Sequence, residues 1–172
     1  MFTAAAPDQV WLADLTYIWT AEGWLYLAVV LDLYTRRVVS WAMADHLGQE
    51  LALAALDMAI VRQRPAPGLV HHADRGVQYA AHGYRARLQA HGMLCSMNRK
   101  GGCWDNAPME SFFATLKGEL VEEANYQTRD EARADVFQYI EGFYNRRRLH
   151  SALGYLTPEQ KTAAFQSAAS AA

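Results

Sequence analysis

The fold is decided by residues 10–43, whose sequence is VWLADLTYIWTAEGWLYLAVVLDLYTRRVVSWAM. Residues 10–18 alternate between two faces, residues 24–33 are almost continuously apolar, β-branched or aromatic, and residues 38–43 form a third short apolar run. Runs of this length and pattern are typical of β-strands. The links between them are too short for a parallel crossover, so the sequence predicts three antiparallel neighbouring strands.

Beyond residue 43 the apolar pattern changes its period. Apolar residues recur at helical spacing over residues 48–62, and residues 64–68, rich in proline and glycine, end that pattern. The remaining expected elements are a strand at 69–72, a helix at 84–90, a strand at 93–96, and helices at 106–121 and 128–147. Three strands followed by alternating helices and strands predict an α/β fold, in which a five-stranded mixed sheet is flanked by helices.

No linker or internal repeat divides the chain, so we expect a single domain. This domain occupies residues 10–162, after an N-terminal extension at residues 1–9. Residues 163–172 are rich in alanine and serine and are expected to be disordered.

The composition is that of an ordinary globular protein, with 52% apolar and 20% charged residues. No apolar run reaches the roughly 18 residues of a membrane span, and no secretory signal is found, so we expect no membrane partner and a cytoplasmic location. Two separated cysteines give no disulfide framework. The net charge of −2 is low for a nucleic-acid-binding domain, but the carboxylates of a metal site would add negative charge, and arginines cluster locally at residues 146–148.

Three carboxylates occupy positions where a bound ion would offset their charge. Asp14 lies inside an apolar strand, where a charge is costly unless it is compensated. Asp74 directly follows a short strand, and ligands of open α/β sheets gather beyond the carboxyl ends of strands. Glu110 lies in the first turns of a helix, with Lys117 seven residues later on the same face. Each also has a plain structural interpretation: a solvent-facing strand residue, a turn aspartate and a carboxylate that complements the helix dipole.

Oxygen ligands on separate elements suit Mg²⁺, and two such ions about 3.5–4 Å apart drive phosphoryl displacement in known enzymes. Residue types alone leave this hypothesis open, because four other aspartates are also candidates: Asp32, Asp45, Asp57 and Asp105.

Five segments in order resemble the catalytic core of insertion-sequence transposases of the retroviral-integrase type. They are WLADLTYI (11–18), EGWLYLA (22–28), HADRGVQY (72–79), DNAPMESFFATLK (105–117), and the pair YN (144–145) followed by RLHSALGYLTP (148–158). The resemblance spans about residues 10–160, and 35 residues lie between positions 74 and 110, the spacing of the D-D-E group. Ala13 stands where many relatives have threonine and Ala73 where many have serine, but both only flank the carboxylates.

This resemblance implies a ribonuclease-H-like fold and a metal-dependent polynucleotidyl transferase. Such an enzyme cuts DNA at transposon ends, and the freed 3′-hydroxyl attacks another DNA strand. The resemblance makes Asp14, Asp74 and Glu110 the ligands of Mg²⁺ or Mn²⁺, with two ions expected. The DNA contacts that it implies are Arg99, Lys100, Asn106 and Lys117, of which Asn106 is also expected to cap its helix.

The implied partners are transposon-end DNA, target DNA and further copies of the chain, at least a dimer on DNA. Full transposases of this type carry helix-turn-helix and coiled-coil segments ahead of the core. None is found in this sequence, so we expect a core without sequence-specific recognition of DNA ends.

Three alternatives stay open. Histidines and cysteines gather in residues 71–103, but zinc sites usually need close ligand pairs, and His71 and His72 would point to opposite faces of a strand. A ribonuclease-H-type nuclease would share the fold and the carboxylates. A core kept only for DNA binding or assembly would share the fold without activity, although all three carboxylates are present.

Overall fold

A computed structural model describes residues 2–74, 76–97 and 106–172. Within these residues one sheet is formed in the strand order β3-β2-β1-β4-β5. The strands are β1 (Val10–Thr20), β2 (Gly23–Asp32), β3 (Val38–Ala44), β4 (Val70–Ala73) and β5 (Leu94–Met97). β1, β2 and β3 are antiparallel neighbours, whereas β4 pairs in parallel with both β1 and β5. The predicted five-stranded mixed sheet is confirmed.

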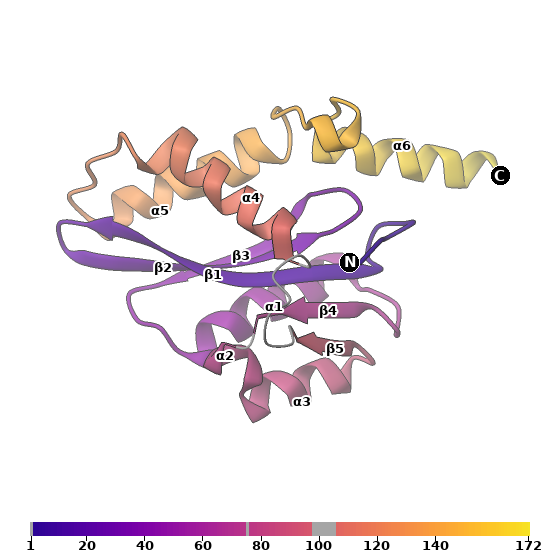
Figure 1. The fold of residues 1–172 in the computed structure, drawn as a ribbon, viewed down its shortest axis with the longest axis horizontal. Coiled ribbons are helices and arrows are strands. Elements are labelled where there is room, and N and C mark those ends of the chain that lie inside the picture. The colour runs from indigo at the N-terminus through magenta and orange to yellow at the C-terminus, as the bar shows by residue number, and fades with distance from the viewer. Residues whose placement is uncertain (1, 75, 98–105) are drawn as a thin grey trace.

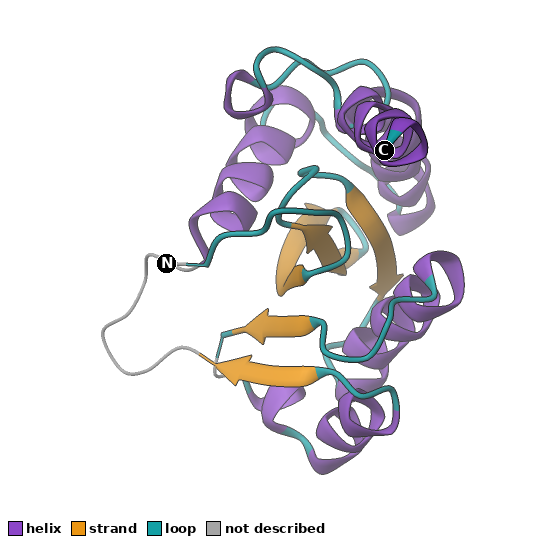
Figure 2. Ribbon diagram, turned by 90° about the vertical axis from the view of Figure 1, so that its right-hand side faces the viewer, coloured by secondary structure: helices purple, strands orange, loops and turns teal. Residues whose placement is uncertain are grey.

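Helices cover both faces of this sheet (Figure 1). One layer contains α1 (Gln49–Gln63), α2 (Val77–Ala80) and α3 (His82–Ala90). The other contains α4 (Ala107–Leu116) and α5 (Arg129–Phe137), and the chain ends in α6 (Pro158–Ala171). Figure 2 shows the sheet between the two helical layers. No helix of the described residues combines the length and apolar character that crossing a membrane requires.

The alternation of β1 determines which helices each of its side chains meets. Val10, Leu12 and Ile18 belong to the core that includes the buried residues of α4 and α5. Trp11 and Ala13 belong to the core beneath α1 and α3. The predicted assignment of faces is therefore confirmed. Because side chains alternate along a strand, Asp14 faces the α4 layer together with Leu12.

The helices predicted at 106–121 and 128–147 are present, but each widens before it ends. α4 continues into a π-helical turn at Lys117–Val121, and α5 continues into one at Gln138–Tyr144. These wide turns are closed by hydrogen bonds from Glu122 N–H to the Lys117 carbonyl (2.8 Å) and from Asn145 N–H to the Ile140 carbonyl (3.1 Å). Such turns rotate the side chains that follow them away from the regular helical spacing.

The end of the chain corrects one expectation. Of residues 163–172, which were expected to be disordered, residues 163–171 lie within α6. The helix begins at a capping box, in which Thr157 Oγ1 accepts from Gln160 N–H and Gln160 Oε1 accepts from Thr157 N–H. The Phe165 ring packs at 5.6 Å from the Tyr34 ring in the turn after β2. Composition misled here because alanine is the strongest helix former once a helix has a capped start.

The N-terminal extension packs on the domain. The Phe2 ring lies 4.9 Å from the His72 ring. Asp8 N–H donates to Asp32 Oδ2 at 2.8 Å. Residues 2–9 are thereby attached at two separate points.

Candidate active site

Asp14 is a partly buried carboxylate in the middle of β1. Leu15 N–H donates to its Oδ1 at 2.7 Å, and Asn106 Nδ2 donates to its Oδ2 at 3.4 Å. Burial, and to a smaller degree the negative charges of Asp74 and Glu110, raise the pKa of Asp14 to about 6. The surroundings therefore disfavour the charged carboxylate unless a cation compensates it.

Two further elements, the end of β4 and the start of α4, bring Asp74 and Glu110 toward Asp14 in β1. β4 runs parallel to β1 with Ala73 opposite Ala13, so the chain leaves β4 at Asp74 beside Asp14. Glu110 lies exposed in the first turn of α4, the helix that covers the Asp14 face of β1. Because both carboxylates raise the pKa of Asp14, all three share one electrostatic environment. The structure thus brings together the three residues that the sequence singled out.

The other candidate aspartates within the described residues are engaged elsewhere. Asp32 accepts hydrogen bonds from the backbone and side chain of Thr35 at 2.8 and 2.7 Å. Asp45 pairs with His46 and Asp57 pairs with Arg87. Asp105 lies outside the described residues. Asp32, Asp45 and Asp57 thus have partners outside the group of Asp14, Asp74 and Glu110.

The donor set of this cluster suits a hard divalent cation, because oxygen ligands are those that Mg²⁺ and Mn²⁺ prefer. A cation would also relieve the mutual repulsion that raises the pKa of Asp14. Across residues 2–74, 76–97 and 106–172, no three Asp, Glu, His or Cys side chains are arranged closely enough to hold a metal ion. Within the described residues, the three carboxylates therefore share an electrostatic environment without a closed coordination geometry.

The raised pKa of Asp14 predicts a pH-dependent gain in stability for Asp14→Asn in metal-free buffer. Between about pH 4 and pH 6 the folded protein holds a proton that the unfolded chain releases, so the wild type loses stability as the pH rises through this range. Asparagine carries no charge, and the Asn106 amide can rotate to offer its unpartnered Oδ1. We expect the variant to gain about 2 kcal/mol over wild type at pH 7.5, since one pKa unit is about 1.4 kcal/mol and the site is partly solvated.

Urea denaturation with EDTA at pH 4 and pH 7.5 measures this gain. Asp130→Asn is the control, because the Asp130 side chain is 95% exposed. A gain for Asp14→Asn that is the same at both pH values would contradict the assignment.

The structure corrects the role expected for Asn106. It stands at the start of α4, but its side chain makes no capping hydrogen bond and is buried, with 1% of its surface exposed. The amide donates to Asp14 instead. This buried amide is therefore placed to orient the Asp14 carboxylate, and a contact between Asn106 and DNA stays a prediction.

Lys117 lies over an aromatic ring that the sequence did not single out. Its Nζ is 5.2 Å from the centre of the Tyr17 ring. Tyr17 and Trp19 both pack edge-on against Trp24, at 4.9 and 4.8 Å, and all three are at least 41% exposed. Exposed aromatic residues at alternating positions of β1, opposite in face to Asp14, are the sequence signal that could have identified this cluster. The expected contacts Arg99 and Lys100 lie outside the described residues.

His71 and His72 point to opposite faces of β4, as predicted. The His71 Nε2 contacts the Tyr84 hydroxyl of α3 at 2.7 Å, and burial lowers the pKa of His71 to about 4. The His72 Nδ1 lies 3.0 Å from Ser96 Oγ. Both histidines therefore have polar neighbours of their own within the sheet and its helical layer.

Two family models, both described as the integrase core domain, match residues 4–103 and 91–158. The chain belongs to the integrase core domain family. It is 52% identical over 157 residues to an uncharacterized 31 kDa protein of insertion element IS600 from Shigella sonnei, covering 91% of this chain and 58% of that protein. It is 45% identical over 159 residues to the transposase for insertion sequence element IS904 from Lactococcus lactis, covering 92% and 63%. This integrase core domain thus spans about three fifths of the length of these curated relatives.

Solved structures share the fold of this integrase core. A chain of the simian T-cell lymphotropic virus intasome matches with a TM-score of 0.75 and 16% identity, over 94% of this chain and 56% of that chain. The HTLV-2 integrase catalytic core domain in complex with magnesium matches with a TM-score of 0.71 and 14% identity, over 93% and 99%. At these identities the likeness concerns the fold, and it confirms the ribonuclease-H-like architecture that the sequence predicted.

Proposed function

We propose that this integrase core is the catalytic part of a bacterial DNA transposase. It would cut phosphodiester bonds at the ends of an insertion sequence and join the freed 3′-hydroxyl to another DNA strand. One observation carries the proposal: Asp14 in β1, Asp74 at the end of β4 and Glu110 in α4 share one electrostatic environment. Burial, and to a smaller degree the charges of the other two carboxylates, raise the pKa of Asp14. The naming of relatives as transposases supports the same reaction class.

In this proposal the three carboxylates hold the metal ions, and two neighbouring groups orient Asp14. Asp14, Asp74 and Glu110 would hold two Mg²⁺ or Mn²⁺ ions. When bound, such ions activate the attacking oxygen and stabilise the leaving oxygen of a phosphodiester. Leu15 N–H and Asn106 Nδ2 fix the two oxygens of Asp14, so that this carboxylate keeps its orientation before and after DNA binds.

The partners follow from the reaction. The substrates are transposon-end and target DNA, and further copies of the chain, at least a second one, would be needed to hold two DNA ends together. Related viral cores have been solved in dimeric and trimeric forms. We place the reaction in the bacterial cytoplasm, on the nucleoid.

The direct test incubates the 172-residue chain with labelled duplex DNA and either Mg²⁺ or Mn²⁺. Cleavage together with products longer than either substrate supports the proposal. Hydrolysis of RNA–DNA hybrids without any joining would instead assign a ribonuclease-H-type nuclease. DNA binding with no reaction in either metal would favour a binding or assembly module.

Lys117→Ala should weaken DNA binding in a salt-dependent manner. Lys117 follows Glu110 by two helical turns, and its ammonium rests on the exposed Tyr17 ring, three residues along β1 from Asp14. Loss of one phosphate contact should reduce the slope of log K against log salt by about 1. Fluorescence anisotropy over a range of KCl concentrations measures this slope. The matched control is Lys161→Ala, because Lys161 makes the same kind of ring contact, with Tyr34 at 4.7 Å, on α6. Equal slopes for wild type and Lys117→Ala would remove the lysine from the DNA interface.

A further inference from the structure

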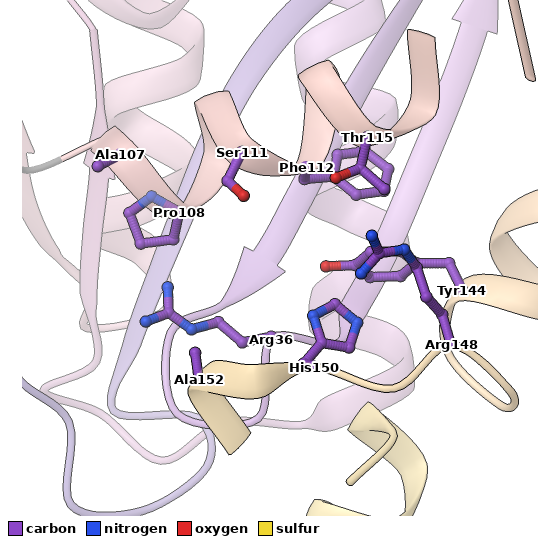
Figure 3. Close-up of a pocket in the computed structure, with 10 residues that line it drawn as sticks. All are labelled: Arg36, Ala107, Pro108, Ser111, Phe112, Thr115, Tyr144, Arg148, His150 and Ala152. Atoms are coloured by element: carbon purple, nitrogen blue, oxygen red, sulfur yellow. The ribbon is translucent and has the colours of Figure 1, made fainter. Parts of the chain in front are cut away.

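A cavity of about 290 Å³ lies between α4 and the segment that carries the Tyr144 to Pro158 motif. Its polar lining comes from three places: Ser111 and Thr115 on α4, Arg36 in the turn between β2 and β3, and Tyr144, Arg148 and His150 of the motif. Figure 3 shows these side chains arranged around one space. The sequence resemblance singled out this motif, but the carboxylate cluster gives it no task.

Several side chains that can donate hydrogen bonds line the cavity, and one of them, His150, has an unpaired ring nitrogen within the described residues. Ser111 and Thr115 stand one turn apart on α4, and the Tyr144 hydroxyl faces them across the space (Figure 3). His150 Nε2 is buried and, within the described residues, has no hydrogen-bond partner. Buried polar atoms are rarely left unpaired in native proteins, so the orphaned ring nitrogen of His150 offers a position for a ligand or a water, beside the more exposed hydroxyls of Ser111 and Thr115.

The cavity also has an uncompensated positive charge. Arg148 forms an ion pair with Glu119 at 2.9 Å, which balances its charge. Arg36 has no carboxylate within salt-bridge distance in the described part of the chain, and burial lowers the pKa of its guanidinium. Asp32 attracts Arg36 without forming an ion pair with it within the described residues. Arg36 is therefore the cation available to an anion in the cavity.

The backbone of Arg36 has an uncommon conformation. Its φ of 59° lies in the left-handed region, which residues other than glycine, asparagine and aspartate seldom adopt. Such a conformation is retained only where the surrounding structure requires it. Here it holds a charged side chain against α4 in a half-buried position, where solvation alone would favour a more exposed one.

We propose that this cavity binds one phosphate of the DNA backbone, with Arg36 as its cation and Ser111, Thr115, Tyr144 and His150 as hydrogen-bond donors. A guanidinium with hydroxyl groups is a common phosphate-recognising set. Ser111 follows Glu110 on α4, so a strand held here would pass within a helical turn of the acidic cluster. The choice of DNA as the source of the phosphate rests on the proposed function.

The test has one arm with DNA and one without. In the first, anisotropy titrations without divalent cations compare wild type with Arg36→Gln over a range of KCl concentrations. Loss of one phosphate contact should lower affinity about tenfold at low salt and reduce the salt slope by about 0.9. Arg85→Gln is the control, because it removes the same charge from an exposed position on α3, in the opposite helical layer.

In the second arm, inorganic phosphate is added while the imidazole resonances of His150 are followed by NMR. Burial and the charges of Arg148 and Arg36 lower the pKa of His150 to about 4, and a bound anion should raise it by a unit or more. Arg36→Gln should abolish this response. Ser111→Ala, at an exposed helical position that tolerates alanine, should weaken it if Arg36→Gln disturbs folding.

The outcomes separate the two proposals. An Arg36→Gln variant that matches Arg85→Gln in DNA binding, with no phosphate effect on His150, would overturn the cavity as an anion site. A phosphate effect without a change in the salt slope would overturn DNA as its source. Absence of DNA binding by the wild type would defeat the proposed function, while the phosphate arm would still decide for or against the anion site.

Discussion

Replacement of Asp14, Asp74 or Glu110 by its amide should lower the rate of DNA cleavage and joining by about 10³-fold or more. Loss of a hydrogen-bond partner of a metal ligand typically costs 10–100-fold, and a lost ligand should cost more. The amides keep the shape of each side chain but remove the charge that, in the proposed mechanism, would hold a cation. Joining assays with Mg²⁺ and Mn²⁺, together with calorimetric titration of Mn²⁺ into each variant, measure both activity and metal binding.

Graded controls separate a metal site from a general effect. Asn106→Ala, which removes the hydrogen bond to Asp14, should fall between the wild type and the amide variants. Asp130→Asn should behave as the wild type. A triple amide variant should be little worse than the single ones, because residues that act as a unit are not additive. Retention of the wild-type rate and metal affinity by any one amide variant would exclude that residue from the site.

Replacement of Asn145 by alanine should destabilise the fold by about 3 kcal/mol. Asn145 is 5% exposed, and its amide pairs with the edge strand β3 much as a further strand would. Val38 N–H donates to Asn145 Oδ1 at 2.9 Å, and Asn145 Nδ2 donates to the Val38 carbonyl at 3.0 Å. Without the amide both backbone groups of Val38 lose their partner, and each buried unpaired group costs about 1–3 kcal/mol.

Urea denaturation at pH 7.5 measures this loss, which corresponds to a decrease in Tm of about 6–12 °C for a chain of this size. Asn125→Ala is the matched control, because Asn125 is exposed. A loss for Asn145→Ala below about 1 kcal/mol would show that water replaces the amide, and that the Tyr-Asn pair of the motif has a task other than holding β3.

The strands and their faces could be predicted because they depend on local periodicity. In β1 the order of apolar residues alone places Leu12 and Ile18 on one face and Trp11 on the other, and the structure has the same faces. The same alternation predicts that Asp14 lies on the same face of β1 as Leu12. Short links between the first three strands exclude a parallel arrangement, so their pairing needed no long-range information either.

For the proposed site, the residues could be predicted from the motifs, but their burial and their hydrogen-bond partners could not. The motifs identified Asp14, Asp74 and Glu110, and the fold brings them into one electrostatic environment. The sequence could not show that Asp14 is half-buried with a raised pKa, because that depends on what α4 covers. It also predicted that Asn106 caps its helix, as asparagine at a helix start commonly does, and the family resemblance added a contact with DNA.

By itself the sequence determined the order of elements and the faces of β1, because both depend on residue spacing along a few neighbouring turns or strands, whereas the three carboxylates were predicted from the motifs of the family resemblance. Only the tertiary structure decided the partners of the buried amides and of Arg36. Asn106 and Asn145 bond to groups 92 and 107 residues away, and the cavity joins a turn after β2 to a helix and a motif far along the chain. Long-range packing determines such partners, so the local sequence around a polar residue does not predict which distant group will lie beside it.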